Sequence, residues 1–194
     1  MPPRIYLIRH GETEWSLFGQ HTSRTDIPLT VHGEDAARKI GQRLRQIQFT
    51  RVMTSPRQRA RQTCELAGLI STAEIEPDLA EWDYGDYEGK TSAQILAARP
   101  DWNLFGDGCP RGEMPAQVSD RADRLIARLS ALKGNIALFS HGHFGRVLAA
   151  RWIGSPVGAA QHFLLDTASL NILGYEHNLT KSPVIALWNS GSAG

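Results

Sequence analysis

Short strand-like runs that end in polar, reactive residues are the feature that most limits what this chain can fold into. They lie at residues 5–8, 52–54 and 136–139, and each is typical of a short buried strand. Patterns of helical period separate them and predict helices over about 30–47, 56–69 and 114–132, and one ending near residue 152. Strands that alternate with helices predict an α/β fold with a largely parallel sheet.

The remaining segments give weaker signals. A loop is expected over 77–90, a helix over 91–98 that ends before Pro100, and further strands at 163–165, 170–175 and 184–188. Residues 190–194 are expected to form a loose tail. The chain has 194 residues and no internal repeat, so we expect one domain spanning 1–194.

Composition limits the kinds of partner. Hydrophobic residues make up 41% of the chain and the formal net charge is +1. A charge this small gives no overall attraction to nucleic acid or to an anionic membrane, so neither is expected as a partner. A small acidic substrate would have to be bound by a local cluster of positive charge.

The two cysteines and the N-terminus suggest a location. Cys64 and Cys109 have no metal-ligand spacing and are too few for a disulfide framework. The first residues contain no long apolar run, so they predict neither a signal peptide nor a membrane span. We therefore expect a cytoplasmic protein with reduced cysteines, and a single disulfide is the alternative.

Three polar segments follow predicted strands: residues 9–10, 55–61 and 140–143. In a largely parallel sheet, ligand sites gather at the carboxyl ends of the strands. The first segment contains His10, and a neutral imidazole can attack phosphorus to form a labile phosphoramidate. Gly11 would let the backbone pass close to a phosphate. Alone, these residues fit a solvated strand end better.

Arginines dominate the second segment. Guanidinium groups bind phosphate oxygens through two parallel hydrogen bonds and stay charged. Arg57 and Arg61 lie four residues apart and share a helix face, whereas Arg59 points elsewhere. Either face could point toward a phosphate site, and a solvated basic helix is the alternative.

The third segment contains His141 and His143. A second imidazole beside a phosphoryl group could donate hydrogen bonds to the charge of the transition state. The His-x-His spacing also suggests a metal site, but no cysteine with ligand spacing and no acidic pair accompanies it. We expect no metal and no other cofactor.

Hydrolysis of a phosphate monoester also requires a proton for the leaving oxygen, and a carboxyl group near aromatic rings could supply it. The aromatic segment 79–89 offers four candidates, and the spacing does not choose among them: Glu81, Asp83, Asp86 and Glu88. An acidic surface loop is the alternative explanation.

Together these motifs, in this order and over residues 5–188, resemble the histidine phosphatase superfamily, also called the phosphoglycerate-mutase-like family. The resemblance implies a three-layer α/β/α sandwich around a mostly parallel sheet. It also implies hydrolysis of a phosphate monoester through a phosphohistidine. The matching positions give His10 as the nucleophile, Arg9 and Arg59 as phosphate ligands, Glu81 as the proton donor and His141 as the second histidine.

Residues 84–89, Tyr-Gly-Asp-Tyr-Glu-Gly, and the short chain resemble the phosphatases of the family more than its mutases. A sugar mono- or bisphosphate is the implied substrate. Its further contacts are expected at His21, Thr22, Tyr84, Arg146 and His177. Ser16 replaces an asparagine found in many relatives, which affects contacts near it. A phosphoglycerate mutase, a protein phosphohistidine phosphatase and a non-catalytic binder of phosphorylated ligands are the alternatives.

Overall fold

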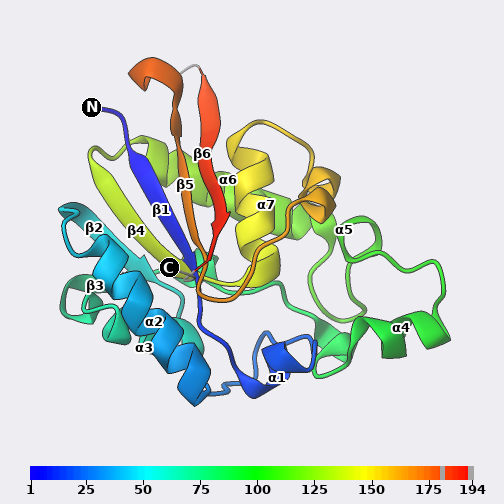
Figure 1. Ribbon diagram of the computed structural model, residues 1–194. Helices are drawn as coiled ribbons and strands as arrows, with labels where there is room; N and C mark the ends of the chain where they lie inside the picture. The colour runs from blue at the N-terminus through cyan, green and yellow to red at the C-terminus, as the bar shows by residue number, and fades with distance from the viewer. Residues whose placement is uncertain (180–181, 192–194) are drawn as a thin grey trace.

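The computed structural model describes residues 1–179 and 182–191. Within these residues the chain has one six-stranded sheet of order β3-β2-β4-β1-β5-β6 (Figure 1). Four strands are parallel: β1 (Arg4–Arg9), β2 (Phe49–Thr54), β3 (Ala73–Ile75) and β4 (Asn135–Ser140). The last two, β5 (Leu170–Tyr175) and β6 (Pro183–Ser190), are antiparallel.

The central strands β1 and β4 are buried on both faces. Ile5, Leu7, Ile136 and Leu138 belong to the core on one side, and Ile8 and its neighbours to the core on the other. Continuous apolar runs are typical of parallel strands covered by helices. This explains why the runs at 5–8 and 136–139 do not alternate with polar residues.

Helices cover both faces of the sheet (Figure 1). α2 (Val31–Leu44) and α3 (Gln58–Leu66) pack on one face, and α6 (Pro115–Ser130) and α7 (Gly142–Trp152) on the other. The predicted three-layer α/β/α sandwich is confirmed, with a mixed sheet at its centre. Within the described residues, no helix has the length and apolar character needed to cross a membrane.

Three shorter helices lie outside the layers that cover the sheet: α1 (Glu14–Leu17), α4 (Ser92–Ala98) and α5 (Leu104–Asp107). In Figure 1, α1 and α4 lie below the strands and α5 lies to the right of α7. Backbone bonds join the segments of α1 and α4, since His21 N–H donates to the Lys90 carbonyl across 2.9 Å. Short 3₁₀ helices occur at Ile70–Thr72, Pro77–Leu79, Gly85–Tyr87, Val157–His162 and Glu176–Asn178.

Two expectations for secondary structure were wrong, and one strand was missed. Residues 163–165 form no strand, because Phe163 packs against Trp188 and the Leu164 carbonyl accepts the Trp188 indole N–H. The short edge strand β3 was not predicted, since it lacks an apolar run. Ser190 ends β6 and accepts hydrogen bonds from Arg43, so it is not tail. Residues 192–194 of that expected tail lie outside the described residues.

Candidate active site

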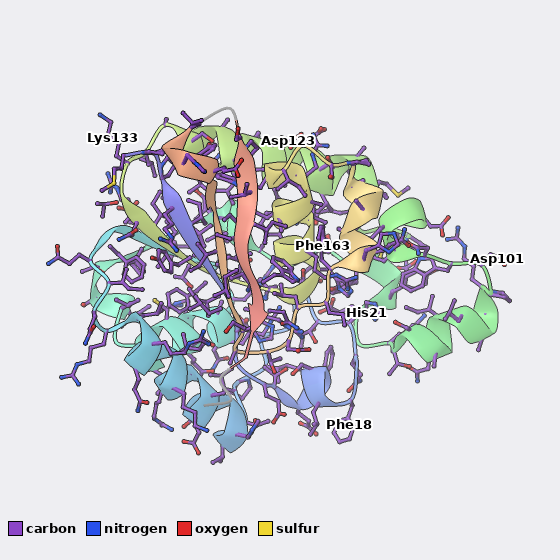
Figure 2. All side chains as sticks on the ribbon, turned by 45° about the horizontal axis from the view of Figure 1, so that its top comes forward. Phe18, His21, Asp101, Asp123, Lys133 and Phe163 are labelled. Atoms are coloured by element: carbon purple, nitrogen blue, oxygen red, sulfur yellow. The ribbon has the colours of Figure 1, made fainter. Side chains whose placement is uncertain are left out.

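A cavity of about 160 Å³ opens at the carboxyl ends of β1 and β4. In Figure 2, His21 lies between α1 and the lower end of α7, at the wall of this cavity. Side chains and backbone from the strand ends, the α1 segment, the 81–92 segment and α7 line it: Arg9, His10, Ser16, Gly19, Gln20, His21, Thr22, Glu81, Tyr84, Ser92, Gly142, His143, Arg146 and Leu165.

His10 follows β1 and is buried, with 4% of its surface exposed. Its Nδ1 lies 2.7 Å from the Gly11 carbonyl oxygen, which can only accept, so Nδ1 carries the proton. Nε2 therefore keeps its lone pair. Burial, followed by the charges of Arg59 and Arg9, holds the pKa of His10 well below 6.5. The imidazole is neutral and nucleophilic at physiological pH.

Two guanidinium groups flank this ring. Arg59 is fully buried on α3, and its Nε lies 3.3 Å from His10 Nε2. Carbonyl oxygens of Thr22 and Thr25 hold the other end of its side chain, at 2.9 and 3.2 Å. Arg9 donates to the Leu165 carbonyl, while its buried Nε has no hydrogen-bond partner in the part of the chain that the structure describes.

His141 lies at the end of β4, directly before α7. It is fully buried, and its ring centroid is 5.2 Å from that of His10. Its Nε2 is 2.7 Å from Ser55 Oγ. Burial, with the charge of Arg59 next, holds the pKa of His141 well below 6.5. The predicted pair of imidazoles beside two arginines is therefore brought together by β1, β4 and α3.

Glu81 is the carboxylate that reaches the cavity. One oxygen accepts the backbone N–H groups of Trp82 and Phe144 at 2.9 and 2.8 Å, and the other accepts that of His143 at 3.1 Å. Backbone N–H groups thus hold both oxygens of Glu81 at the N-terminus of α7.

The other three acidic candidates bind elsewhere. Asp83 pairs with Arg24, and Asp86 pairs with Arg111. Glu88 accepts bonds from the Ser23 backbone and hydroxyl, and so holds the segment after His21 in place. Of the four carboxylates that the spacing left open, Glu81 is therefore the one that lines the cavity.

Four of the five expected substrate contacts line the cavity: His21, Thr22, Tyr84 and Arg146. His177 does not. β5 runs antiparallel to β1, so its C-terminal end lies at the opposite edge of the sheet from His10. His177 follows that end and is exposed. Its expected place in the site was wrong, because antiparallel strands present their carboxyl ends at the other edge.

The guanidinium of Arg146 is already anchored. Its Nε and one Nη donate to the carbonyls of Ala160 and Gln161 at 3.0 and 2.8 Å, and it stacks over Phe105 at 4.7 Å. No carboxylate within the described residues forms a salt bridge with it. Its positive charge is therefore available to an anionic group in the cavity.

Sequence reasoning missed His143 as a wall of the site. Its Nδ1 is 2.6 Å from the Tyr84 hydroxyl, and its ring stacks on His21 with centroids 5.8 Å apart. Burial, with the charge of Arg146 next, holds its pKa well below 6.5. The signal that could have found it is its position in the first turn of the helix after His141. Ser16, at the position where many relatives have asparagine, also lines the cavity. Gln20 and Ser92 line it too, from segments that carry no comparable signal.

Within residues 1–179 and 182–191, no three or more His, Cys, Asp and Glu side chains cluster in a way that could hold a metal ion. Cys64 and Cys109 are separate buried thiols, and burial raises the pKa of each to about 12.

Comparison with known proteins identifies the family. The sequence model of the histidine phosphatase superfamily (branch 1) matches residues 5–190. An acid phosphatase of Mycobacterium tuberculosis is 44% identical over 188 residues, 95% of this chain and 92% of that protein. The sedoheptulose 1,7-bisphosphatase of Saccharomyces cerevisiae is 33% identical, covering 96% of this chain and 93% of that protein.

A solved structure has the same fold as this chain. The product of an open reading frame of Mycobacterium tuberculosis superposes with a TM-score of 0.91 and 40% identity, over 98% of both chains. The resemblance inferred from the motifs is confirmed over nearly the whole chain. The chain belongs to the histidine phosphatase superfamily, branch 1, and is a phosphoric monoester hydrolase of that superfamily.

Proposed function

We propose that this enzyme hydrolyses a sugar mono- or bisphosphate through a covalent phosphohistidine on Nε2 of His10. One observation carries the proposal: the proton of His10 is fixed on Nδ1 by Gly11, so a lone pair remains on Nε2, 3.3 Å from a buried guanidinium. When a phosphoryl oxygen takes over the Arg59 N–H, this lone pair is free for in-line attack on phosphorus.

In the first step, Nε2 of His10 attacks phosphorus and the ester P–O bond breaks. Glu81, which must be protonated in the enzyme–substrate complex, gives its proton to the leaving oxygen. It can reach that oxygen because Glu81 and His10 line the same cavity. Arg9, Arg59 and His141 stabilise the charge on the phosphoryl oxygens. The imidazole keeps its Nδ1 proton, and the Gly11 carbonyl stabilises the positive charge that develops on the ring.

In the second step, water attacks the phosphohistidine. Glu81, now a carboxylate, accepts a proton from that water, and the P–N bond breaks. His10 returns to its neutral form and inorganic phosphate leaves. The same carboxyl group therefore acts first as an acid and then as a base, from one position at the N-terminus of α7.

The walls of the cavity support a small, polar leaving group. The polar side chains of His21 and His143 line the cavity, and Arg146 adds a positive charge. A sugar offers hydroxyl groups to such walls, and a second phosphate would bind the guanidinium. The name of the yeast relative, a sugar bisphosphatase, supports this substrate class, and that of the mycobacterial relative, an acid phosphatase, supports phosphatase activity.

A screen for phosphate release from phosphorylated metabolites tests the proposal. We expect sugar phosphates among the best substrates, no loss of activity in EDTA, and no turnover by His10→Ala. Normal turnover by that variant would reject the scheme. Transfer of phosphate between carbons of phosphoglycerate, with little release to water, would instead indicate a mutase.

A further inference from the structure

We propose that Ser55 is a positioning residue that fixes the tautomer of His141. Nδ1 of this histidine then carries the proton, and its N–H donates a hydrogen bond to the bound phosphoryl group. The proposal rests on the proposed function, since it assigns a state to one of the phosphate ligands. Ser55 itself would not touch the substrate.

The contact between the two side chains is short and enclosed. Ser55 and His141 are both fully buried, and Ser55 Oγ lies 2.7 Å from His141 Nε2. Ser55 follows β2 and its N–H donates to the Phe139 carbonyl on β4, at 2.9 Å. Because β2 and β4 are parallel neighbours in the sheet, Ser55 and His141 follow strands that end at the same edge.

The direction of this hydrogen bond follows from the other bonds of Ser55. Its oxygen already accepts the Arg57 backbone N–H at 3.3 Å. A buried hydroxyl proton needs an acceptor, and within the described residues His141 Nε2 is the acceptor that the hydroxyl reaches. Ser55 therefore donates to Nε2. A neutral imidazole has one N–H, so Nδ1 must hold it.

That N–H is a buried donor without an acceptor. Nδ1 of His141 has no hydrogen-bond partner in the described part of the chain, and Nε of Arg9 also lacks one there. Both groups lie next to His10: Arg9 precedes it in the sequence and the two imidazoles are 5.2 Å apart. Unsatisfied buried donors that gather beside a nucleophile are suited to an anion.

The two histidines of the site are thereby held in opposite tautomers. Gly11 keeps the proton of His10 on Nδ1, which leaves the Nε2 lone pair for attack. Ser55 keeps the lone pair of His141 on Nε2, which leaves the Nδ1 proton for the phosphoryl oxygen. In the other tautomer, His141 would present a lone pair to an anion and repel it.

Nitrogen-15 NMR of histidine-labelled enzyme reads the tautomer without a substrate. His141 is assigned by the loss of its signals in His141→Gln. We expect a protonated Nδ1 in the unaltered enzyme and in Ser55→Thr, which keeps the hydroxyl. Ser55→Ala should shift the proton toward Nε2 and weaken binding of inorganic phosphate by about tenfold or more.

Ser140→Ala is the matched control. This serine is also fully buried and directly precedes His141, but its hydroxyl donates to the Leu79 carbonyl at 2.8 Å. It should leave the tautomer of His141 unchanged, whatever it does to stability. A protonated Nε2 in the unaltered enzyme overturns the proposal, as does an unchanged His141 spectrum in a folded Ser55→Ala. Failure of the unaltered enzyme to release phosphate would reject the proposed function instead.

Discussion

Nε of Arg59 lies 3.3 Å from Nε2 of His10, although the two residues are 49 positions apart in the sequence. The nitrogen that would attack phosphorus is thus hydrogen-bonded to a group that would bind the phosphoryl oxygens. The bond can form only while Nε2 is unprotonated, so the same contact opposes protonation of the nucleophile and aligns it.

Arg59 should therefore affect both binding and the acidic limit of activity. Arg59→Lys keeps the charge but loses the planar group, and should lower kcat/KM by roughly 10- to 100-fold. Arg59→Met also removes a charge that lowers the pKa of His10, so that pKa should rise and the acidic limb of the pH–rate profile should move to higher pH.

Arg61→Met is the control for both variants. Arg61 lies on the same helix but is exposed, so its loss should change neither kcat/KM nor the pH profile. An acidic limb at the same pH in Arg59→Met and in the unaltered enzyme would contradict this account.

Glu81→Gln should separate substrates by their leaving groups. Without the acidic proton, kcat for an alkyl phosphate such as glycerol phosphate should fall by about 10²–10⁴-fold. Nitrophenolate leaves without protonation, so the first step on p-nitrophenyl phosphate should be much less affected. Rapid-quench measurement of alcohol and phenol release compares the two.

Asp86→Asn supplies the control for that loop, because Asp86 pairs with Arg111 rather than lining the cavity. It should leave both rates nearly unchanged. Equal losses of leaving-group release on both esters in Glu81→Gln would show that Glu81 is not the acid.

The sequence predicted the sheet and the ring of residues around His10 for a physical reason. Parallel strands bring their carboxyl ends together, so His10, Ser55 and His141 had to meet once β1, β2 and β4 were neighbours. The pattern could not choose Arg59 over Arg57, or Glu81 over Glu88, because helix phase and loop geometry decide those positions. The family resemblance made these choices, and the structure brings the same residues together.

Other features were beyond the sequence. His177 follows an antiparallel strand, and nothing in its local pattern showed that β5 reverses direction. His143 belongs to the wall of the cavity through Tyr84 and His21, both distant in the chain. The three-residue strand β3 forms because β2 pairs with it, since its own residues are largely exposed.

Stability should fall in mild acid. Burial is the main cause that holds the pKa values of His10, His141 and His143 well below 6.5 in the folded enzyme. In the unfolded chain these histidines bind protons near pH 6.5, whereas in the folded enzyme they stay neutral to lower pH. Below pH 6.5, proton binding therefore favours the unfolded state. Each histidine should cost about 1.4 kcal/mol per pH unit until its folded pKa is reached.

Urea unfolding at pH 7.5 and 5.5 measures this effect. The free energy of unfolding should be lower at pH 5.5, and the difference should shrink in His10→Ala, which removes one of the three groups. A free energy that stays constant or rises between pH 7.5 and 5.5 would contradict the buried, neutral state of these histidines.

Gly33 allows the segment after His10 to lie against α2. A Cβ at this position would be 2.2 Å from the Glu12 carbonyl oxygen. Gly33→Ala should therefore destabilise the fold by about 1–3 kcal/mol and lower activity by displacing residues 11–13. At Gly106, which lies in α5, a Cβ would meet nothing within 4 Å, so Gly106→Ala should be neutral or slightly stabilising. Thermal unfolding of both variants measures the difference. Equal midpoints for the two variants would contradict this packing.

Direct detection of the covalent intermediate tests the central claim. The enzyme is mixed with a ³²P-labelled sugar phosphate, quenched in alkali within milliseconds, digested and analysed for the labelled peptide. We expect alkali-stable, acid-labile label on His10 that chases into phosphate with unlabelled substrate. Turnover with no label on His10, or label on another residue that turns over at the rate of catalysis, would contradict the phosphohistidine mechanism.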